Sequence, residues 1–427
     1  MGSVSPPPDL PSYDQAAAIV AAHAAQLMRH PPTVEQLTLA KSVGRVLAQP
    51  LRADADQPLF ARSARDGFAC RVAEASTHRP LFVVGASRAG DAPSGPLPRG
   101  AAWEIMTGAP VPKGADAVMM VEHVELSGDP NSPAVRLLPP RTVREGENVI
   151  ARGVQARKGD LLLPAGTAIS AAQIALAGFC GCTTLKVFVR PRVAILATGD
   201  ELVPIHTKPA PGHIRNSSSA MLAAMVAAAG GEPWVLPTAR DNPKSLDAAL
   251  ARSASAELLL ITGGVSAGKF DLVEPALARI GARFHFTGVR IQPGKPLVFG
   301  QRPAARAKPL QRLRSMQWFF GLPGNPVSSA VTFLLFAAPL LAGLSGRRDH
   351  GPRFALARLG ADVERKSGLT RFLPAACTFA GPLPQVELVS WQGSGDLAAM
   401  ARANCFLVLP DNVDHLNAGD TVRILLS

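Results

Sequence analysis

The sequence predicts a multidomain α/β protein with a central doubly wound parallel sheet, an all-β lobe before it and a C-terminal β-barrel or sandwich after it. Three patterns predict this fold class. Apolar strand-length runs alternate with helical segments between residues 191 and 345, as in parallel sheets covered by helices. Short β-like runs separated by Gly/Pro clusters fill residues 51–140. Similar runs with glycine turns follow residue 352.

The N-terminal elements are of mixed character. The first is a helix, which Pro31 and Pro32 stop. Further elements of this kind return after the all-β lobe, so we expect a split linker domain. Its elements are a helix at 13–28, a strand and turn at 34–47, a helix at 171–179 and a strand at 184–189. The strands of the lobe are predicted at 81–84, 102–106, 117–121 and 134–138.

The central segment has a strand–helix rhythm that is typical of a parallel sheet. Its strands are predicted at 193–197, 234–236, 257–262, 296–300 and 316–320, and its helices at 218–229, 245–251, 272–280 and 330–344. The complete division of the chain is then residues 1–50 plus 141–190 for the linker domain, 51–140 for the lobe, 191–345 for the α/β domain and 346–427 for the C-terminal domain.

Composition excludes several classes of protein. Hydrophobic residues make up 47% of the 427 residues and charged residues 18%, so the chain buries real cores and is not disordered. Its five cysteines contain no Cys-x-x-Cys pair, which excludes a disulfide-stapled secreted scaffold and favours a reducing cytoplasm. The apolar run at 330–344 is shorter than the roughly 20 residues of a spanning helix. We therefore expect a buried core helix there and no membrane segment.

The net charge of +12 suits an anionic partner. Nucleic acid is not the expected one, because aromatic residues are only 5% of the chain and there is a single tyrosine, which leaves few platforms for base stacking. A phosphorylated metabolite or an oxyanion is therefore the expected anionic partner.

Two glycine-rich bends carry the strongest functional signal. The segment 258–271 (LLLITGGVSAGKFD) runs from a buried strand through a glycine bend into a helix, and 316–329 does the same through GLPGNPVSS. Glycine permits positive φ, and a helix N-terminus favours an anion. Asn325 is the expected N-cap and Pro326 the first helical residue. Since carboxyl ends of parallel strands share one edge, we expect one anion pocket at both bends.

Two motifs overlap the first bend. A phosphate loop of the Walker type needs Ser or Thr where Phe270 stands, so that interpretation is disfavoured. Residues 264–268 read G-x-S-x-G, the pattern of a nucleophile elbow, so a serine hydrolase using Ser266 is an alternative. No downstream histidine follows a sheet strand convincingly.

Charged residues follow other strand ends. Asp200 and Glu201 come directly after the strand at 193–197, and Asp241 and Asp271 follow other strands of the sheet. Carboxylates of this kind are candidate magnesium ligands. Lys295 stands on the stiff turn QPGKP, where a point charge suits phosphate or an oxyanion.

Taken together, the motifs resemble the molybdopterin molybdenumtransferase family, of the MoeA and gephyrin E-domain type. TGDEL, RNSSS, TGGVSAGKFD, QPGKP and GLPGNPVSS occur in this order, with SARDGFA and MTGAPVPKGADAV before them and GSGDLAAMARANCFLVLP after them. The resemblance implies a molybdopterin-binding fold in the α/β domain and an elongated homodimer of four-domain chains. It also implies insertion of molybdenum from molybdate into adenylylated molybdopterin, with magnesium and release of AMP.

The resemblance also implies roles for single residues. Asp66 resembles the acid that reaches the partner subunit's site, and Glu201 and Asp271 resemble acids that hold the metal. Catalytic roles fall on Asp66, Glu201, Asp271 and Lys295. The loops and the resemblance together assign substrate binding to Thr107, Thr198, Gly199, Asp200, Gly263, Gly264, Val265, Ser266, Gly268, Pro293, Gly294, Pro296, Gly321, Pro323, Gly324, Asn325 and Pro326.

The chain departs from the family pattern at five positions. Gln292 stands where the family has lysine, and Lys269 where it has an acid. Arg65, Asn148 and Ala399 replace an apolar residue, an aspartate and a serine. A diverged non-catalytic or scaffold homologue is therefore a second alternative. The partners that the resemblance implies are a molybdopterin-adenylating protein and acceptor molybdoenzymes or their chaperones, in the cytoplasm, with no nucleic acid and no membrane.

Overall fold

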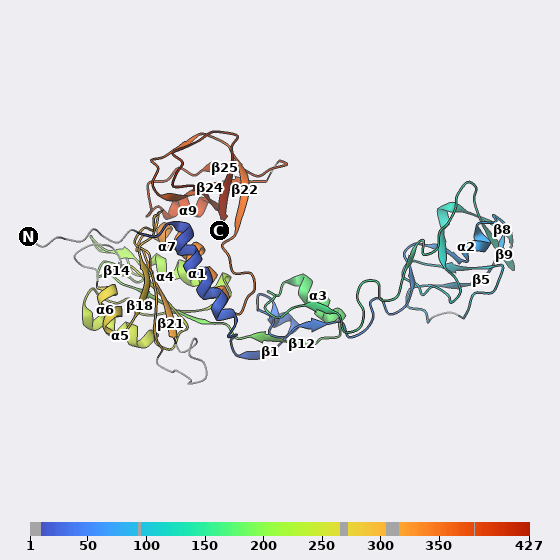
Figure 1. The fold of residues 1–427 in the computed structure, drawn as a ribbon, viewed down its shortest axis with the longest axis horizontal. Coiled ribbons are helices and arrows are strands. Elements are labelled where there is room, and N and C mark those ends of the chain that lie inside the picture. The colour runs from blue at the N-terminus through green and yellow to red at the C-terminus, as the bar shows by residue number, and fades with distance from the viewer. Residues whose placement is uncertain (1–9, 93–94, 265–271, 305–315, 380) are drawn as a thin grey trace, which may run out of the picture. The chain divides into compact units, whose positions relative to one another are not determined.

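The computed structural model describes residues 10–92, 95–264, 272–304, 316–379 and 381–427 (Figure 1). It divides into two compact units, each described by itself. Unit 1 comprises Met1–Ala48, Gly166–Ser170 and Thr184–Ser427, and unit 2 comprises Gln49–Ala165 and Ala171–Thr183. The predicted fold class is confirmed: an α/β sheet domain, an all-β lobe and a C-terminal barrel are all present.

In the six-stranded main sheet of unit 1, five strands run in one direction, and β20 (Val298–Pro303) runs antiparallel to both of its neighbours, β21 (Met316–Leu322) and β18 (Arg283–Thr287). Hydrophobic runs show where strands lie but not which way they point, so the sequence did not reveal the reversed direction of β20, and β18 was not predicted as a strand. The strand order is β16 (Glu232–Val235), β13 (Arg192–Ala197), β17 (Leu258–Thr262), β21 (Met316–Leu322), β20 (Val298–Pro303) and β18 (Arg283–Thr287).

The side chains of the sheet belong to two hydrophobic cores, one on each face, because successive side chains of a strand point to opposite faces. Leu260 and Phe320 belong to the core beneath α1 and α4, whereas Leu259 and Phe319 belong to the core beneath α5 and α6. One face is covered by α1 (Tyr13–Met28), α4 (Ser217–Ala228), α7 (Pro326–Thr332) and α8 (Ala338–Leu344). The other face is covered by α5 (Pro243–Ser253) and α6 (Val273–Arg279).

Helix α1 spans the predicted residues. Ser12 and Gln15 form a capping box at its start, in which each side chain accepts a hydrogen bond from the other residue's backbone N–H. Its buried stripe includes Ala24, which packs so closely on α8 that a Cβ added to Gly343 would lie 2.7 Å from the Ala24 Cα. Small residues at this crossing let the two helices touch.

The predicted core helix is confirmed. Residues 326–344 form α7 (Pro326–Thr332), a π-helical turn (Phe333–Ala337) and α8 (Ala338–Leu344). The helix is long and apolar enough to span a membrane by length and composition alone, but 89% of its apolar window is buried inside the structure. Pro339 has no N–H to donate, and the π turn accommodates this: the Ala338 N–H bonds to the Phe333 carbonyl.

The C-terminal domain is a closed barrel, since β24 pairs with both β25 and β26. The strands of the barrel are β22 (Phe354–Leu359), β24 (Thr370–Thr378), β25 (Gln385–Leu388), β26 (Cys405–Leu409) and β28 (Thr421–Leu426). The short helix α9 (Leu397–Arg402) precedes β26. Strand β19 (Ile291–Gln292) pairs with β24 and so ties the barrel to the loop before β20. The remaining pairs of unit 1 are β1 (Val34–Thr38) with β12 (Thr184–Phe188), β14 (Leu202–Val203) with β15 (Ile214–Arg215), and β23 (Val363–Glu364) with β27 (His415–Leu416).

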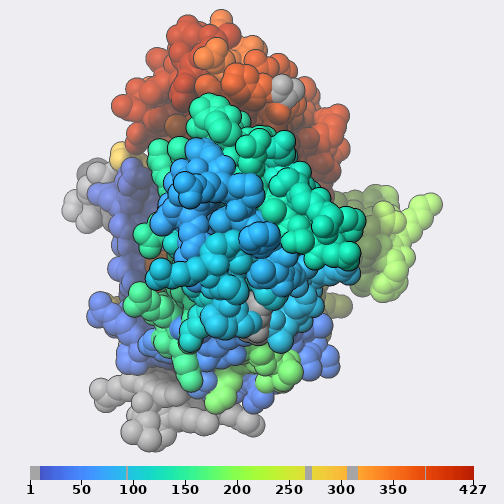
Figure 2. Space-filling model, turned by 90° about the vertical axis from the view of Figure 1, so that its right-hand side faces the viewer, coloured from blue at the N-terminus to red at the C-terminus, as the bar shows by residue number. Residues whose placement is uncertain are grey.

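Unit 2 contains the predicted all-β lobe. In Figure 2 its early, blue segments and its later, green ones share one surface, as the pairing of β4 with β7 requires. The lobe's strand order is β7 (Ala117–Met120), β4 (Gly67–Cys70), β6 (Ala101–Ile105), β5 (Leu81–Ser87), β9 (Ser132–Leu137) and β8 (Val124–Asp129). The unit also holds α2 (Val72–Ala75), α3 (Ala171–Phe179), β2 (Leu51–Arg52) with β11 (Leu161–Leu163), and β3 (Arg62–Ser63) with β10 (Val149–Ile150).

Two histidines link α1 to the edge of the main sheet. The rings of His23 and His285 lie 4.3 Å apart, beside Trp318 and Phe299. Burial, with the charges of His23 and Arg283, lowers the pKa of His285 to about 4, and burial also lowers the pKa of His23. Both rings are therefore neutral at pH 7.

This pair predicts a loss of stability in acid. Unfolded His285 takes up its proton near pH 6.5 and the folded form only near pH 4, so the free energy of unfolding falls as pH drops through that window. Allowing for solvent screening, we expect a loss of about 1–2 kcal/mol. Urea unfolding at pH 7.5 and 5 measures it, and His285→Phe reduces the difference. An equal pH dependence in the variant would contradict the assignment.

Candidate functional site

A cavity of about 510 Å³ opens at the carboxyl edge of the parallel strands β13, β17 and β21. Crevices at this edge are the usual ligand sites of open α/β sheets. Strand ends, the start of α4, the start of α7 and one loop of the barrel domain form its wall. The lining residues are Ala197, Thr198, Glu201, Leu202, Ile214, Arg215, Asn216, Ser217, Ser218, Thr262, Gly263, Gly324, Asn325, Pro326, Gly395 and Leu397.

The two predicted glycine bends lie side by side in this cavity. A Cβ added to Gly324 would be 3.5 Å from the Gly263 Cα. The Thr262 hydroxyl donates to the Pro323 carbonyl (3.3 Å), and Ser329 in α7 donates to the same carbonyl. These buried bonds fasten one bend to the other.

Two details of the predicted amide cradle are wrong. Gly321 is not a bend residue: it lies in the ladder of β21, opposite Ile261 and Val298, and the bend starts only at Pro323. The Gly263 N–H is also not free for a ligand, because it donates to the Leu322 carbonyl at 3.3 Å. The protein itself therefore uses part of the predicted donor set.

Thr198 supplies an unused hydrogen-bonding group at the bend. Its hydroxyl is buried and has no hydrogen-bond partner in the described part of the chain. It would lie 3.1 Å and 2.9 Å from Cβ atoms added to Gly263 and Gly264, whose φ angles are +91° and +64°. Only glycine fits both the backbone conformation and this approach. The hydroxyl is thus available to a ligand, since buried polar groups are almost always satisfied.

The predicted carboxylates are brought together only in part. Asp200 and Asp241 each accept a hydrogen bond from the other's backbone N–H (3.4 Å), which joins the ends of β13 and β16. The exposed Glu201 carboxylate lies over Gly199 and lines the cavity. Over the described ranges, no three His, Cys, Asp or Glu side chains gather as a metal site. Asp271, Val265, Ser266, Gly268 and Lys269 lie outside the described residues.

The N-terminus of α4 forms a wall that the site prediction missed. The Asn216 side chain caps the helix by accepting from the Ser219 N–H (3.1 Å), and Ser217 and Ser218 face the cavity in its first turn. N–H groups in a first turn have no helical acceptor. Arg215 also lines the cavity, and its Nε donates to the Thr207 carbonyl at 3.1 Å. The sequence motif RNSSS, residues 215–219, could have indicated these residues as part of the site.

The barrel domain also reaches the site. The Asn325 Nδ2 donates to the Ser394 hydroxyl at 2.8 Å, and the Val327 N–H donates to the Ser394 carbonyl at 3.1 Å. Asn325 thus stands at the N-cap position, but its side chain makes no capping bond, contrary to prediction. Gly395 and Leu397 from the same loop line the cavity. The sequence motif GSGD, residues 393–396, could have indicated that this loop belongs to the site.

The turn that carries Lys295, residues 292–296, lies at the same edge of the sheet, but none of its residues lines the cavity. Val298, which follows the turn, pairs with Gly321 at the end of β21. Gly294 packs against α7, where an added Cβ would be 2.5 Å from the Thr332 Cγ2. Lys295 is exposed, whereas Pro293 is buried and Pro296 half-buried. The fold holds the turn rigidly and leaves its cation in solvent.

In unit 2 the structure joins two predicted residues. The Asp66 Oδ1 accepts hydrogen bonds from the Thr107 backbone N–H (2.6 Å) and hydroxyl (2.7 Å). These bonds, the backbone one first, lower the pKa of Asp66 and keep its exposed carboxylate ionised.

Comparison with known proteins agrees with this geometry. Three family models match in chain order: the MoeA N-terminal region (domains I and II) over residues 11–181, a probable molybdopterin-binding domain over 194–343 and the MoeA C-terminal region (domain IV) over 356–427. The molybdopterin molybdenumtransferase of Synechococcus elongatus is 35% identical over 425 residues, which cover 97% of this chain and 98% of that protein. That of Nostoc sp. is 33% identical over 390 residues, covering 90% and 86%.

The chain belongs to the molybdopterin molybdenumtransferase family. The crystal structure of the molybdopterin biosynthesis MoeA protein of Pyrococcus horikoshii matches with a TM-score of 0.78 at 26% identity, covering 98% of this chain and all of that one. Membership in this family of transferases gives no support to a serine hydrolase at Ser266.

Hydrogen bonds of the side chain accompany two of the departures from the molybdopterin molybdenumtransferase pattern, at Gln292 and Asn148. Gln292 accepts a hydrogen bond from the buried Arg371 guanidinium across the β19–β24 pair, so a cation remains beside the turn. Asn148 has φ +57° and its Nδ2 donates to the Val118 carbonyl at 2.9 Å. An ionised aspartate cannot make that bond, and asparagine tolerates the left-handed conformation.

Proposed function

We propose that this chain is a molybdenumtransferase that inserts molybdenum from molybdate into adenylylated molybdopterin and releases AMP. The observation that carries the proposal is the cavity where both glycine bends meet, with the unpartnered Thr198 hydroxyl, the Glu201 carboxylate and Arg215 on its wall. The family membership supplies the class of substrate.

The groups on this wall suit two anionic substrates. Molybdate is a dianion, and the pterin substrate carries phosphates, so bringing them together costs electrostatic repulsion. Arg215 and the first-turn N–H groups of α4 at Ser217 and Ser218 offset that repulsion. The Thr198 hydroxyl and Asn216 provide further polar contacts that orient a bound molecule.

The residues present fit a magnesium ion. Glu201 has no ion pair among the described residues, and magnesium in proteins takes one or two carboxylates together with substrate phosphates. In the proposal Glu201 and Asp271 hold it. When bound, the ion neutralises charge on the phosphate anhydride whose cleavage releases AMP. The chain's own part is to hold and orient the anhydride between the two bends.

The proposal extends to assembly and partners. The Asp66–Thr107 pair is an ionised, exposed acidic group of unit 2 that suits the role of reaching a partner subunit's site in a homodimer. A protein that adenylates molybdopterin supplies the substrate, and molybdoenzymes or their chaperones receive the product, in the cytoplasm.

Release of AMP from adenylylated molybdopterin in the presence of molybdate tests the proposal directly. We expect Glu201→Gln to lower this rate at least tenfold, because the variant keeps the shape of the side chain and loses its charge. Glu232→Gln, on the exposed edge strand β16, is the matched control and is expected to retain the rate. Unmodified protein that neither releases AMP nor restores a strain lacking its transferase would establish the scaffold alternative instead.

A further inference from the structure

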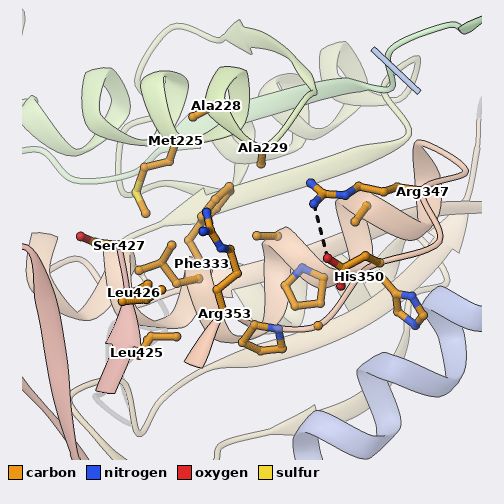
Figure 3. A pocket seen from close by; sticks show the side chains of 17 residues that line it. Met225, Ala228, Ala229, Phe333, Arg347, His350, Arg353, Leu425, Leu426 and Ser427 are labelled. Atoms are coloured by element: carbon orange, nitrogen blue, oxygen red, sulfur yellow. Dashed lines mark ion pairs between the residues drawn. The ribbon is translucent and has the colours of Figure 1, made fainter. Parts of the chain in front are cut away.

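A second cavity, of about 400 Å³, lies in unit 1 away from the candidate site (Figure 3). It is bounded by the C-terminal end of α4, the middle of the core helix, the segment that leads into β22 and the end of β28. The lining residues are Met225, Ala228, Ala229, Phe333, Leu334, Ala338, Pro339, Ala342, Arg347, Asp349, His350, Gly351, Pro352, Arg353, Leu425, Leu426 and Ser427.

The interior of this pocket is apolar. Leu334 and Ala338 are half-exposed within a helix whose other residues after Pro326 are buried, and both line the pocket. Leu334 belongs to the π turn, so the altered helical pitch presents it here. Met225 on α4 faces the same space, and its flexible thioether adapts to different shapes.

The rim is cationic and poorly neutralised. The Arg353 side chain is exposed and makes no ion pair or hydrogen bond with any described residue. The Nε of Arg347 is buried without a partner in that same part of the chain. Its ion pair with Asp349 spans 3.7 Å to a carboxylate that is 83% exposed, a geometry that contributes little. Figure 3 shows both guanidinium groups directed at the space beside Ala229 and Phe333.

We propose that this pocket binds a small carboxylate with a compact apolar body, such as a medium-chain monocarboxylate. The volume falls within the roughly 300–1,000 Å³ of small-molecule sites, which pair apolar walls with a few placed polar groups. Guanidinium groups bind carboxylates through paired, charge-assisted hydrogen bonds. The apolar tail covers Leu334 and Ala338, and the carboxylate satisfies Arg353.

The pocket shares two helices with the candidate site. Helix α4 contributes Ser217 and Ser218 to the site and Met225 and Ala228 to the pocket. The core helix likewise runs from Pro326 at the site to the pocket-lining π turn. A ligand in the pocket therefore touches the C-terminal end of α4 and the middle of the core helix, and the first turns of both helices face the site.

Octanoate is the probe for this proposal. With the full chain labelled at methionine methyl groups, we expect saturable octanoate binding with Kd below about 1 mM, reported by the Met225 methyl signal and not by the Met28 signal. Arg353→Gln is expected to weaken octanoate binding at least tenfold. Arg358→Gln, at an exposed arginine of β22 that does not line the pocket, is the matched control and leaves the affinity unchanged.

Octan-1-ol separates charge recognition from apolar burial. We expect it to bind more weakly than octanoate and with the same affinity in Arg353→Gln as in the unmodified protein. Octanoate that fails to shift Met225, or that binds equally well to Arg353→Gln, would overturn the proposal. These measurements do not depend on catalytic turnover. Their outcome is therefore independent of whether the molybdenumtransferase proposal is correct.

Discussion

Gly263→Ala is expected to lower AMP release at least a hundredfold and the free energy of unfolding by about 2–4 kcal/mol. The added methyl group would lie 2.5 Å from the Thr198 carbonyl oxygen, at a residue with φ +91°. Thr198 cannot move away easily, because its N–H donates to the Thr262 carbonyl (3.0 Å) in the β13–β17 ladder. The bend must open, and the contact between Gly263 and Gly324 opens with it.

Gly230→Ala is the matched control for this prediction. Gly230 has φ +90°, and among the described residues nothing lies within 4 Å of a Cβ added there. The control therefore carries the conformational cost of about 1–2 kcal/mol without the collision. We expect its AMP release to stay within twofold of the unmodified protein, measured alongside urea unfolding. Equal behaviour of the two variants would show that the approach at Thr198 has no consequence for the site.

Arg302→Met is expected to lower the free energy of unfolding by about 3–5 kcal/mol. Arg302 is 4% exposed and has no carboxylate partner among the described residues. Its guanidinium donates to Gln317 Oε1 (2.6 Å), to the Leu250 carbonyl (2.7 Å) and to the Ser253 hydroxyl (2.8 Å). Leu250 and Ser253 lie in the last turn of α5, where the helix dipole favours a cation. Burial lowers the pKa of Arg302 to about 10, so it remains charged at pH 7.

A double variant isolates the network around Arg302. In Arg302→Met the Gln317 amide oxygen is left without its donor, which is costly in a buried position. We expect Arg302→Met with Gln317→Leu to lose at least about 1 kcal/mol less than the sum of the two single changes, because residues in one network are not additive. Urea unfolding of all four proteins gives the coupling energy. Additive losses would mean that the two side chains act separately.

The sequence predicted local features of the fold better than long-range ones. The bounds of α1 follow from its cap at Ser12 and the prolines after it, which are local signals. The apolar run in residues 257–262 likewise predicted strand β17, which spans Leu258–Thr262. Strand β18 was missed and the direction of β20 was not foreseen, since an apolar run does not record which neighbour it pairs with.

The same limit applies to the site. The bend at Gly263 and Gly264 was predictable because a positive φ after a buried strand favours glycine. The place where the β21 ladder ends was not, so Gly321 was assigned wrongly. Ser394 reaches Asn325 across 69 residues of sequence, and no local pattern indicates such a contact.

The pairing of β19 with β24 makes two distant positions depend on each other. A lysine introduced alone at position 292 would meet the Arg371 guanidinium and repel it, so a return to the family's usual residue there is blocked unless position 371 changes first. Mutations at these positions would then be tolerated in one order and rejected in the other. Replacing the C-terminal barrel of this chain by another would have to respect the same constraint, because the barrel carries Arg371, the hydrogen-bond partner of Gln292.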